Sequence, residues 1–182
     1  TFFDRLGILS SPSPQHLVNF LEVVSEACED RVPTANEEES LIRVLKHVRE
    51  HFDELADVNI ESENIGEIEF GDFLSEIQWV PAYRGDDGEA RFGAWENPEA
   101  RLFAPRELIP FALGARCAST RPLTPREVLE FSETARARLE IVRLPSVSDI
   151  CGHFHNVIEN VDADSLGEEE CAALGKVFQE IY

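Results

Sequence analysis

The chain has 182 residues, of which 43% are hydrophobic, so it is long enough and apolar enough to bury a core in one or two domains. Its formal net charge of −20 excludes nucleic acid and anionic membranes as favourable partners, because like charges repel. No apolar run is long enough to predict a transmembrane helix, and the first residues do not have the pattern of a signal peptide.

The acidity has two readings, a surface that attracts basic partners or cations, and adaptation to high salt. The only lysines are Lys46 and Lys176, and acid excess with few lysines favours the high-salt reading. None of the four cysteines forms a Cys-x-x-Cys pair, so neither a zinc motif nor a disulfide framework is indicated. Cysteines on helical patterns are expected to be small buried hydrophobes, and a reducing cytoplasm is the expected compartment.

Residues 13–55 predict a helical hairpin. Ser13 can cap a helix whose first position is Pro14, and apolar residues follow at helical spacing. Thr34 or Asn36 can cap the second helix. A short polar connector favours antiparallel packing of the two helices. The chain opens on what reads as the tail of a helix, so we expect it to be a segment of a longer protein.

Residues 77–104 predict a small antiparallel β module. Its strands are expected at 78–83, 90–95 and 101–104, with a tight Asp-Gly turn within 84–88.

The segments around this module are less regular. Residues 57–66 are acidic and weakly patterned, which predicts a loop, and 70–77 predicts a short helix. A helical turn is expected at 105–109. The stretch 109–122 alternates in part like a strand, without a clear period.

The last third predicts helices again. A helix is expected over 125–139, because Thr124 can cap it and Glu127 can complete a capping box. The segments 149–161 and 168–182 then repeat the pattern of the first hairpin. The fold class is therefore predicted as α+β and mainly helical.

The two hairpins are related by an offset of 133 residues. When residues 1–49 are placed on 134–182 without a gap, eleven of forty-nine positions are identical, and apolar core positions coincide in both helices. We therefore predict a first repeat unit at 1–133 and a partial second unit at 134–182. Stacked neighbouring units would bury the faces that one hairpin leaves open.

The pattern resembles the large repeats of sacsin and its bacterial relatives. The resemblance implies a non-catalytic segment of a very large cytoplasmic, chaperone-associated protein, in which a GHKL-type ATPase domain usually opens each repeat region. No nucleotide-binding motif occurs in this chain, so the segment itself is not expected to bind ATP. The second copy departs from the pattern, since Glu140 replaces Gly7. The matching residues are Leu6-Gly7-Ile8, Pro12-Ser13, Leu41 to Val48, Trp79-Val80-Pro81 and Ala104-Pro105.

Three groups of residues invite a functional reading, and each has a structural alternative that we favour. The run from Cys151 to His155 contains metal-ligand types, but His153 aligns with the core position Phe20 and His155 with Glu22, which we expect to be exposed. The acidic runs Glu37-Glu38-Glu39 and Glu168-Glu169-Glu170 fall at predicted helix N-termini, where the dipole favours them. Asp86-Asp87-Gly88 lacks the spaced oxygens of a calcium loop. No catalytic, cofactor-binding or metal-binding residue is therefore predicted.

Four aromatic residues of the β module form a possible interaction surface. They could line a groove or a partner-binding patch, with Trp95 the member expected to be most exposed, whereas such residues more often pack a sheet against helices. The residues are Trp79, Tyr83, Phe92 and Trp95.

Together these patterns predict a repeat segment without chemistry of its own, acting as a scaffold or a protein-interaction surface. Its partners would be protein clients or neighbouring domains of the same chain. Two alternatives remain, a hydrolase domain that uses acidic groups or the His153/His155 pair, and an acidic regulatory domain that binds basic peptides.

Overall fold

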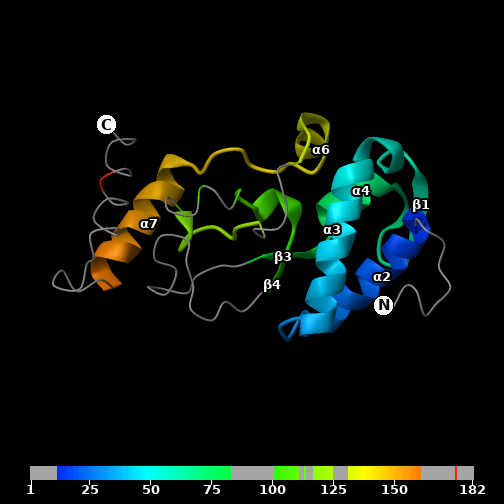
Figure 1. Ribbon diagram of the computed structural model, residues 1–182, viewed down its shortest axis with the longest axis horizontal. Coiled ribbons are helices and arrows are strands. Elements are labelled where there is room, and N and C mark those ends of the chain that lie inside the picture. Colours follow the sequence, from blue (N-terminus) through cyan, green and yellow to red (C-terminus); the bar gives the residue numbers. More distant parts are fainter. Residues whose placement is uncertain are drawn as a thin grey trace.

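The computed structural model of the chain describes residues 12–82, 101–110, 113, 117–124, 131–160 and 175, with the side chains of 157–160 excepted. The fold is α+β, as predicted, with two antiparallel two-stranded sheets among these residues. A group of three helices, α2, α3 and α4, lies at one end of an elongated molecule and α7 lies at the other (Figure 1). None of the described helices has the length and apolarity needed to cross a membrane.

The predicted helical hairpin consists of α2 (Pro14–Ala27) and α3 (Ala35–Leu55). Ser13 caps α2 by accepting a hydrogen bond from the His16 N–H. Thr34, and not Asn36, caps α3, and a complete capping box links it to Glu37. The local sequence therefore sets where both helices begin.

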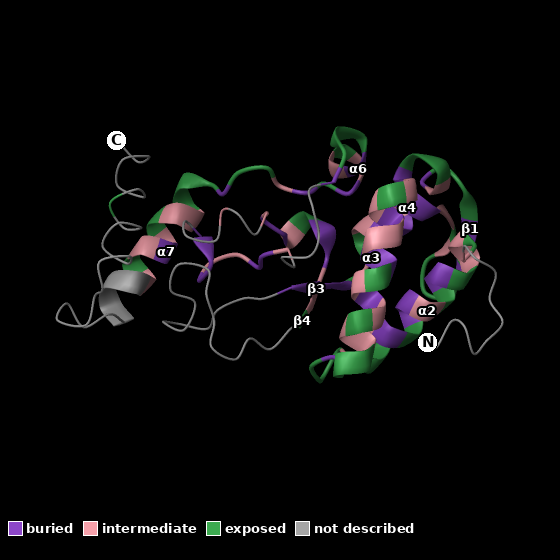
Figure 2. Ribbon diagram, viewed as in Figure 1, coloured by how far each residue is buried: buried purple, intermediate pink, exposed green. Residues whose placement is uncertain are grey.

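The main core lies between this hairpin and the elements that follow it. The buried faces of α2, α3 and α4 turn toward one another (Figure 2). The core also takes in residues from well beyond the hairpin, including Trp79, Leu108, Phe131 and Leu139. A smaller cluster contains Ile109, Cys117, Ala118 and Leu123, and it packs against Leu113 and Val142.

The predicted loop over 57–66 is wrong, because a β-hairpin forms there. Strand β1 (Asn59–Ser62) pairs antiparallel with β2 (Gly66–Glu69). Ile60 and Ser62 point inward, and Ser62 is buried because its hydroxyl donates to Glu22 Oε1 at 2.6 Å. Glu22 was expected to be exposed, but it is only 9% exposed. Strands are usually recognised by alternating apolar residues. Here a buried polar pair, Ser62 and Glu22, occupies an inward position instead, so the pattern was not recognised.

The short helix expected at 70–77 is present as α4 (Phe70–Glu76). Strand β3 (Val80–Ala82) pairs antiparallel with β4 (Arg101–Phe103), and a 3-10 turn, η1 (Pro105–Glu107), follows. The expected middle strand at 90–95 lies outside the described residues. Within 109–122 the described residues show one bridge, from Ile109 to Leu123, and no extended strand.

The single helix predicted over 125–139 is wrong at residues 131–132, which are not helical. Helix α6 (Glu133–Arg138) starts afresh after Ser132, whose hydroxyl accepts from the Ala135 N–H at 3.1 Å. A serine whose hydroxyl caps the helix that follows it is not itself helical, which explains why Ser132 is not part of the helix predicted there.

Helix α6 ends in a Schellman motif. The Ile141 N–H donates to the Arg136 carbonyl and the Glu140 N–H to the Ala137 carbonyl, with Glu140 in the left-handed region at φ 54°. Glycine is the usual residue at this position, and Gly7 occupies the aligned position 133 residues earlier.

Replacing Glu140 with Gly is expected to raise the free energy of unfolding by about 1 kcal/mol, because glycine removes the strain of the left-handed conformation. Chemical denaturation measures the change. Glu140→Gln is the matched control, since it removes the same charge but keeps the Cβ atom. An equal gain in both variants would show that charge near the helix C-terminus, and not backbone strain, is responsible.

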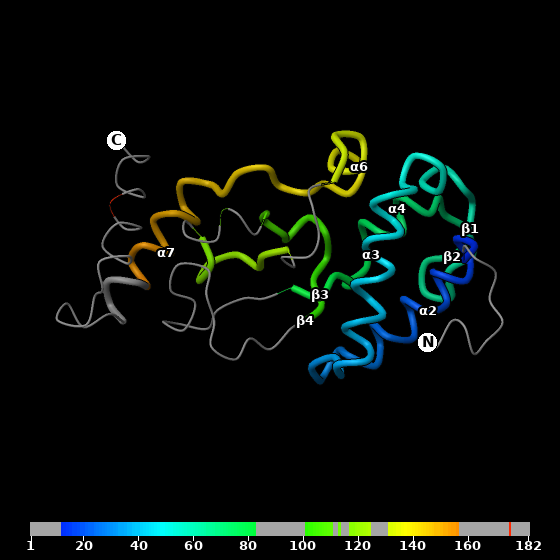
Figure 3. The backbone as a smooth tube through the Cα atoms, viewed as in Figure 1, coloured from blue at the N-terminus to red at the C-terminus, as the bar shows by residue number. Residues whose placement is uncertain are grey.

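Helix α7 (Val147–Asn160) lies at the end of the molecule opposite α2 and α3 (Figure 3). Its first and last residues fall 133 positions after those of α2. Ser146 caps it as Ser13 caps α2, accepting from the Asp149 N–H at 3.1 Å. The second helix of this hairpin, expected over 168–182, lies outside the described residues except for Gly175, which is helical.

The first turn of α3 is expected to make stability depend on acid pH. Glu37 receives two hydrogen bonds from Arg31, and these, followed by the Thr34 N–H, lower the pKa of Glu37 to about 2. The folded state therefore holds a proton less readily than the unfolded chain. The stabilisation is complete above the ordinary pKa of 4.5 and is lost as pH falls toward 2.

Glu37→Gln isolates this contribution. The difference in unfolding free energy between the unmodified chain and the variant is expected to shrink as pH falls from about 4.5 to 2. Urea denaturation at several pH values measures it. A difference that stays constant with pH would contradict the assignment.

Candidate functional site

The predicted aromatic interaction surface is not supported at Trp79. Its side chain has 0% exposure, and its indole Nε1–H donates to the Leu74 carbonyl at 2.9 Å. Trp79 therefore belongs to the core, which is the packing alternative. The other three members, Tyr83, Phe92 and Trp95, lie outside the described residues.

The metal-ligand types in the middle of α7 do not all share a face, because His153 lies on another face from Cys151 and His155. His153 is 2% exposed, as its alignment with Phe20 predicted, whereas His155 is exposed. Cys151 was expected to be buried like other helical cysteines, and this is wrong, since it is exposed. Among the described residues no group of three or more His, Cys, Asp or Glu side chains could hold a metal ion.

His153 instead forms a buried polar cluster with Ser119 and Asn156. Its Nδ1 accepts from the Ser119 N–H at 3.2 Å and lies 2.8 Å from the Ser119 Oγ. The Asn156 amide donates to the same Oγ at 3.2 Å. Because a backbone N–H can only donate, Nδ1 is the acceptor, and the proton of the neutral ring is on Nε2.

A serine hydroxyl beside a histidine nitrogen is also the start of a nucleophilic dyad, which the hydrolase alternative requires. Ser119 is only 6% exposed, however, so its oxygen is shielded from any substrate. The surrounding contacts fix the helix in place: the Thr120 hydroxyl donates to the Asp149 carbonyl at 2.9 Å. A Cβ atom on Gly152 would lie 3.1 Å from Thr120 Cγ2, so helix and turn approach closely. The arrangement fits packing of α7 onto the 117–124 segment better than catalysis.

Arg138 forms the most extensive ionic cluster among the described residues. Its Nε donates to Asp72 at 2.6 Å, one terminal nitrogen donates to Glu69, and the other lies 3.6 Å from Asp57. The hydrogen bonds to Glu69 and then to Asp72 raise the pKa of Arg138 above its ordinary value. One cation from α6 thereby neutralises acidic groups of three earlier segments.

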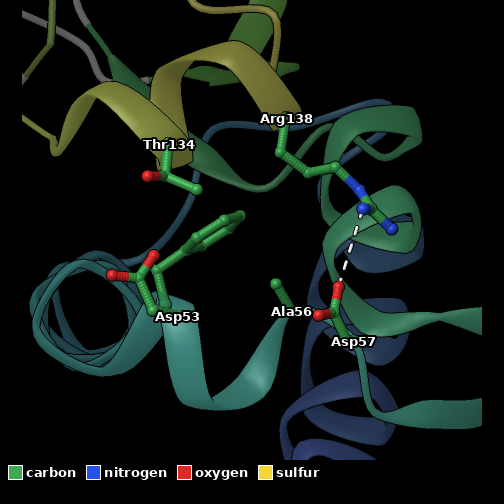
Figure 4. A pocket seen from close by; sticks show the side chains of 6 residues that line it. Asp53, Ala56, Asp57, Thr134 and Arg138 are labelled. Atoms are coloured by element: carbon green, nitrogen blue, oxygen red, sulfur yellow. Dashed lines mark ion pairs between the residues drawn. The ribbon is translucent and has the colours of Figure 1, made fainter.

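A pocket of about 260 Å³ adjoins this cluster. Asp53 and Thr134 lie on one side of it, and the ion pair of Arg138 with Asp57 lies on the other (Figure 4). Phe52 and Ala56 complete the lining. The guanidinium is already engaged by carboxylates, so it is not available to an anionic substrate. Asp53 and Asp57 are exposed to solvent, whereas a carboxyl that acts as a general acid needs a desolvating site.

Neither the Arg138 cluster nor a histidine pair on α3 was identified from the sequence. The cluster joins residues 66 to 81 positions apart, so the sequence held no local signal for it. The pair, His47 and His51, did have a signal, because residues four apart share a helix face.

Comparison of the chain with known protein families, with curated proteins and with solved structures found no match. Function must therefore be inferred from the geometry described above.

Proposed function

We propose that this chain is a non-catalytic repeat segment of a large, cytoplasmic, sacsin-like and chaperone-associated protein, in which it acts as a scaffold or a protein-interaction surface. The observation that carries the proposal is the correspondence of α2 and α7. They have the same length, are offset by 133 residues at both ends, and each follows a capping serine.

The junction between the two units supports a scaffold role. Arg138, at the start of the proposed second unit, aligns with Arg5 at the offset of 133 and ties α6 to α4 and β2. In repeat proteins, contacts between neighbours supply stability that a unit does not have alone. The polar side chains around Arg138 and His153 both make packing contacts of this kind between separate segments of the chain.

A client-contact role can be tested by light scattering. The folded chain is added at equimolar concentration to heated citrate synthase, an aggregating model client, with serum albumin at the same concentration as the control. A delay in aggregation longer than that caused by albumin, and retained as salt is raised, is the expected result. A delay that disappears steeply with salt would favour the acidic, basic-peptide-binding alternative. No delay beyond the control would contradict a client-contact surface.

The hydrolase alternative is tested separately on p-nitrophenyl esters, with Ser119→Ala as the variant. Hydrolysis by the unmodified chain that is lost in a folded Ser119→Ala variant would contradict the non-catalytic assignment. The expected result is that both proteins match the buffer blank.

A further inference from the structure

His47 and His51 form a pair of imidazoles on α3. They are four residues apart, so they lie one turn apart on the same face of the helix. Their ring centroids are 4.7 Å apart, and the rings are tilted by 45°. The pair lies apart from both polar clusters described above and takes part in neither.

The spacing of the rings fits two ligands of one metal ion. With metal–nitrogen distances of about 2.0–2.1 Å, two imidazoles at bond angles between a right angle and the tetrahedral angle place their centroids roughly 4.5–5.2 Å apart. The observed separation of 4.7 Å falls in this interval. Binding would require the two rings to turn so that one nitrogen of each is directed to a common point.

Each ring also has a nitrogen suited to a metal. The Nε2 of His47 is shielded from solvent and has no hydrogen-bond partner, and an unpaired buried polar atom of this kind is costly. Burial, and then the neighbouring His51, lower the pKa of His47.

A carboxylate supports the second ring. The Nδ1 of His51 lies 3.5 Å from Glu54 Oε2. A carboxylate beside one imidazole nitrogen is a common outer-shell partner in metal sites, in which the other nitrogen binds the metal. The carboxylate of Glu50, one position before His51, adds local negative charge. The net charge of −20 likewise attracts cations to the chain.

We propose that His47 and His51 bind one divalent transition-metal ion, with water in the remaining positions. Imidazole nitrogen selects Cu²⁺, Ni²⁺ and Zn²⁺ over the oxygen-preferring Mg²⁺ and Ca²⁺. Two protein ligands, one shielded and one half-exposed, make a moderate-affinity site whose first effect is to clamp one turn of α3. The proposal does not depend on the repeat assignment.

Isothermal titration calorimetry of the whole chain, freed of metal with a chelator, tests the proposal with Ni²⁺ and Zn²⁺ as probes and Mg²⁺ as the negative control. His51→Gln removes one ligand at a half-exposed position and is expected to leave the fold intact, which circular dichroism verifies. His155→Gln, on the exposed face of α7, is the matched control.

Binding of one equivalent is expected, with a dissociation constant at least ~10-fold higher in His51→Gln, because loss of a direct ligand should cost no less than loss of an outer-shell partner. His155→Gln should bind like the unmodified chain, and only Ni²⁺ and Zn²⁺ should raise the melting temperature. Absence of binding, or equal binding in His51→Gln, would overturn the proposal. A loss of affinity in His155→Gln would move the site to α7 and overturn it as well.

Discussion

Replacing Trp79 with Ala is expected to lower the free energy of unfolding by about 3–5 kcal/mol, as for other large-to-small changes of buried aromatic residues. The indole is fully buried in the main core, and its loss leaves both a cavity and an unpaired Leu74 carbonyl. Chemical denaturation followed by circular dichroism measures the loss.

Two further variants separate the causes. Trp79→Phe retains most of the buried ring but not the N–H donor, so its cost should be well below that of Ala. Val23→Ala changes a residue that is 66% exposed and should shift stability by less than about 0.5 kcal/mol. A Trp79→Ala variant as stable as Val23→Ala would favour the interaction-surface reading that the sequence first suggested.

Replacing Arg138 with Ala is expected to cost about 2 kcal/mol, in the range for hydrogen bonds to charged groups. The change removes two hydrogen bonds to carboxylates and leaves Glu69, Asp72 and Asp57 without their common cation in a strongly acidic chain. The loss should become smaller as salt is added, because salt screens the repulsion among the remaining acids.

Arg143→Ala is the matched control for this prediction. Arg143 pairs with Glu133, but both side chains are mostly exposed, at 59% and 79%. Exposed pairs contribute little, so the expected change is below about 1 kcal/mol. Arg138→Lys should recover only part of the lost stability, since lysine cannot reproduce the forked contacts. Equal effects of the two Ala variants, measured by urea denaturation, would contradict a special role for Arg138 in joining α6 to α4.

These two predictions bear on function because both concern contacts that hold distant parts of the chain together. Trp79 anchors the β3–β4 sheet in the main core, and Arg138 ties α6 to α4 and β2. If the chain is a scaffold, its performance depends on how rigidly neighbouring units are coupled. Arg138→Ala then offers a variant that weakens this coupling without changing any predicted interaction surface.

Much of the helical architecture was determined by the sequence alone. Ser13 and Thr34 fixed the starts of α2 and α3, because capping depends on residues only three positions apart. Apolar spacing in α3 identified its buried face, and the predicted helix at 149–161 differs from α7 by only one or two residues at each end. Interactions of this short range can be inferred without knowing the fold.

Only the tertiary structure decided the positions that depend on distant partners. Ser62 and Glu22, 40 residues apart, are hydrogen-bonded and buried together. This contact allows an acidic stretch to form a strand of a β-hairpin. Trp79 became a core residue, and Arg138 found its acids 66 and 69 residues earlier. The sequence does not show whether such a polar or aromatic side chain is buried. Its burial is favourable only when the fold supplies a hydrogen-bond or ion-pair partner.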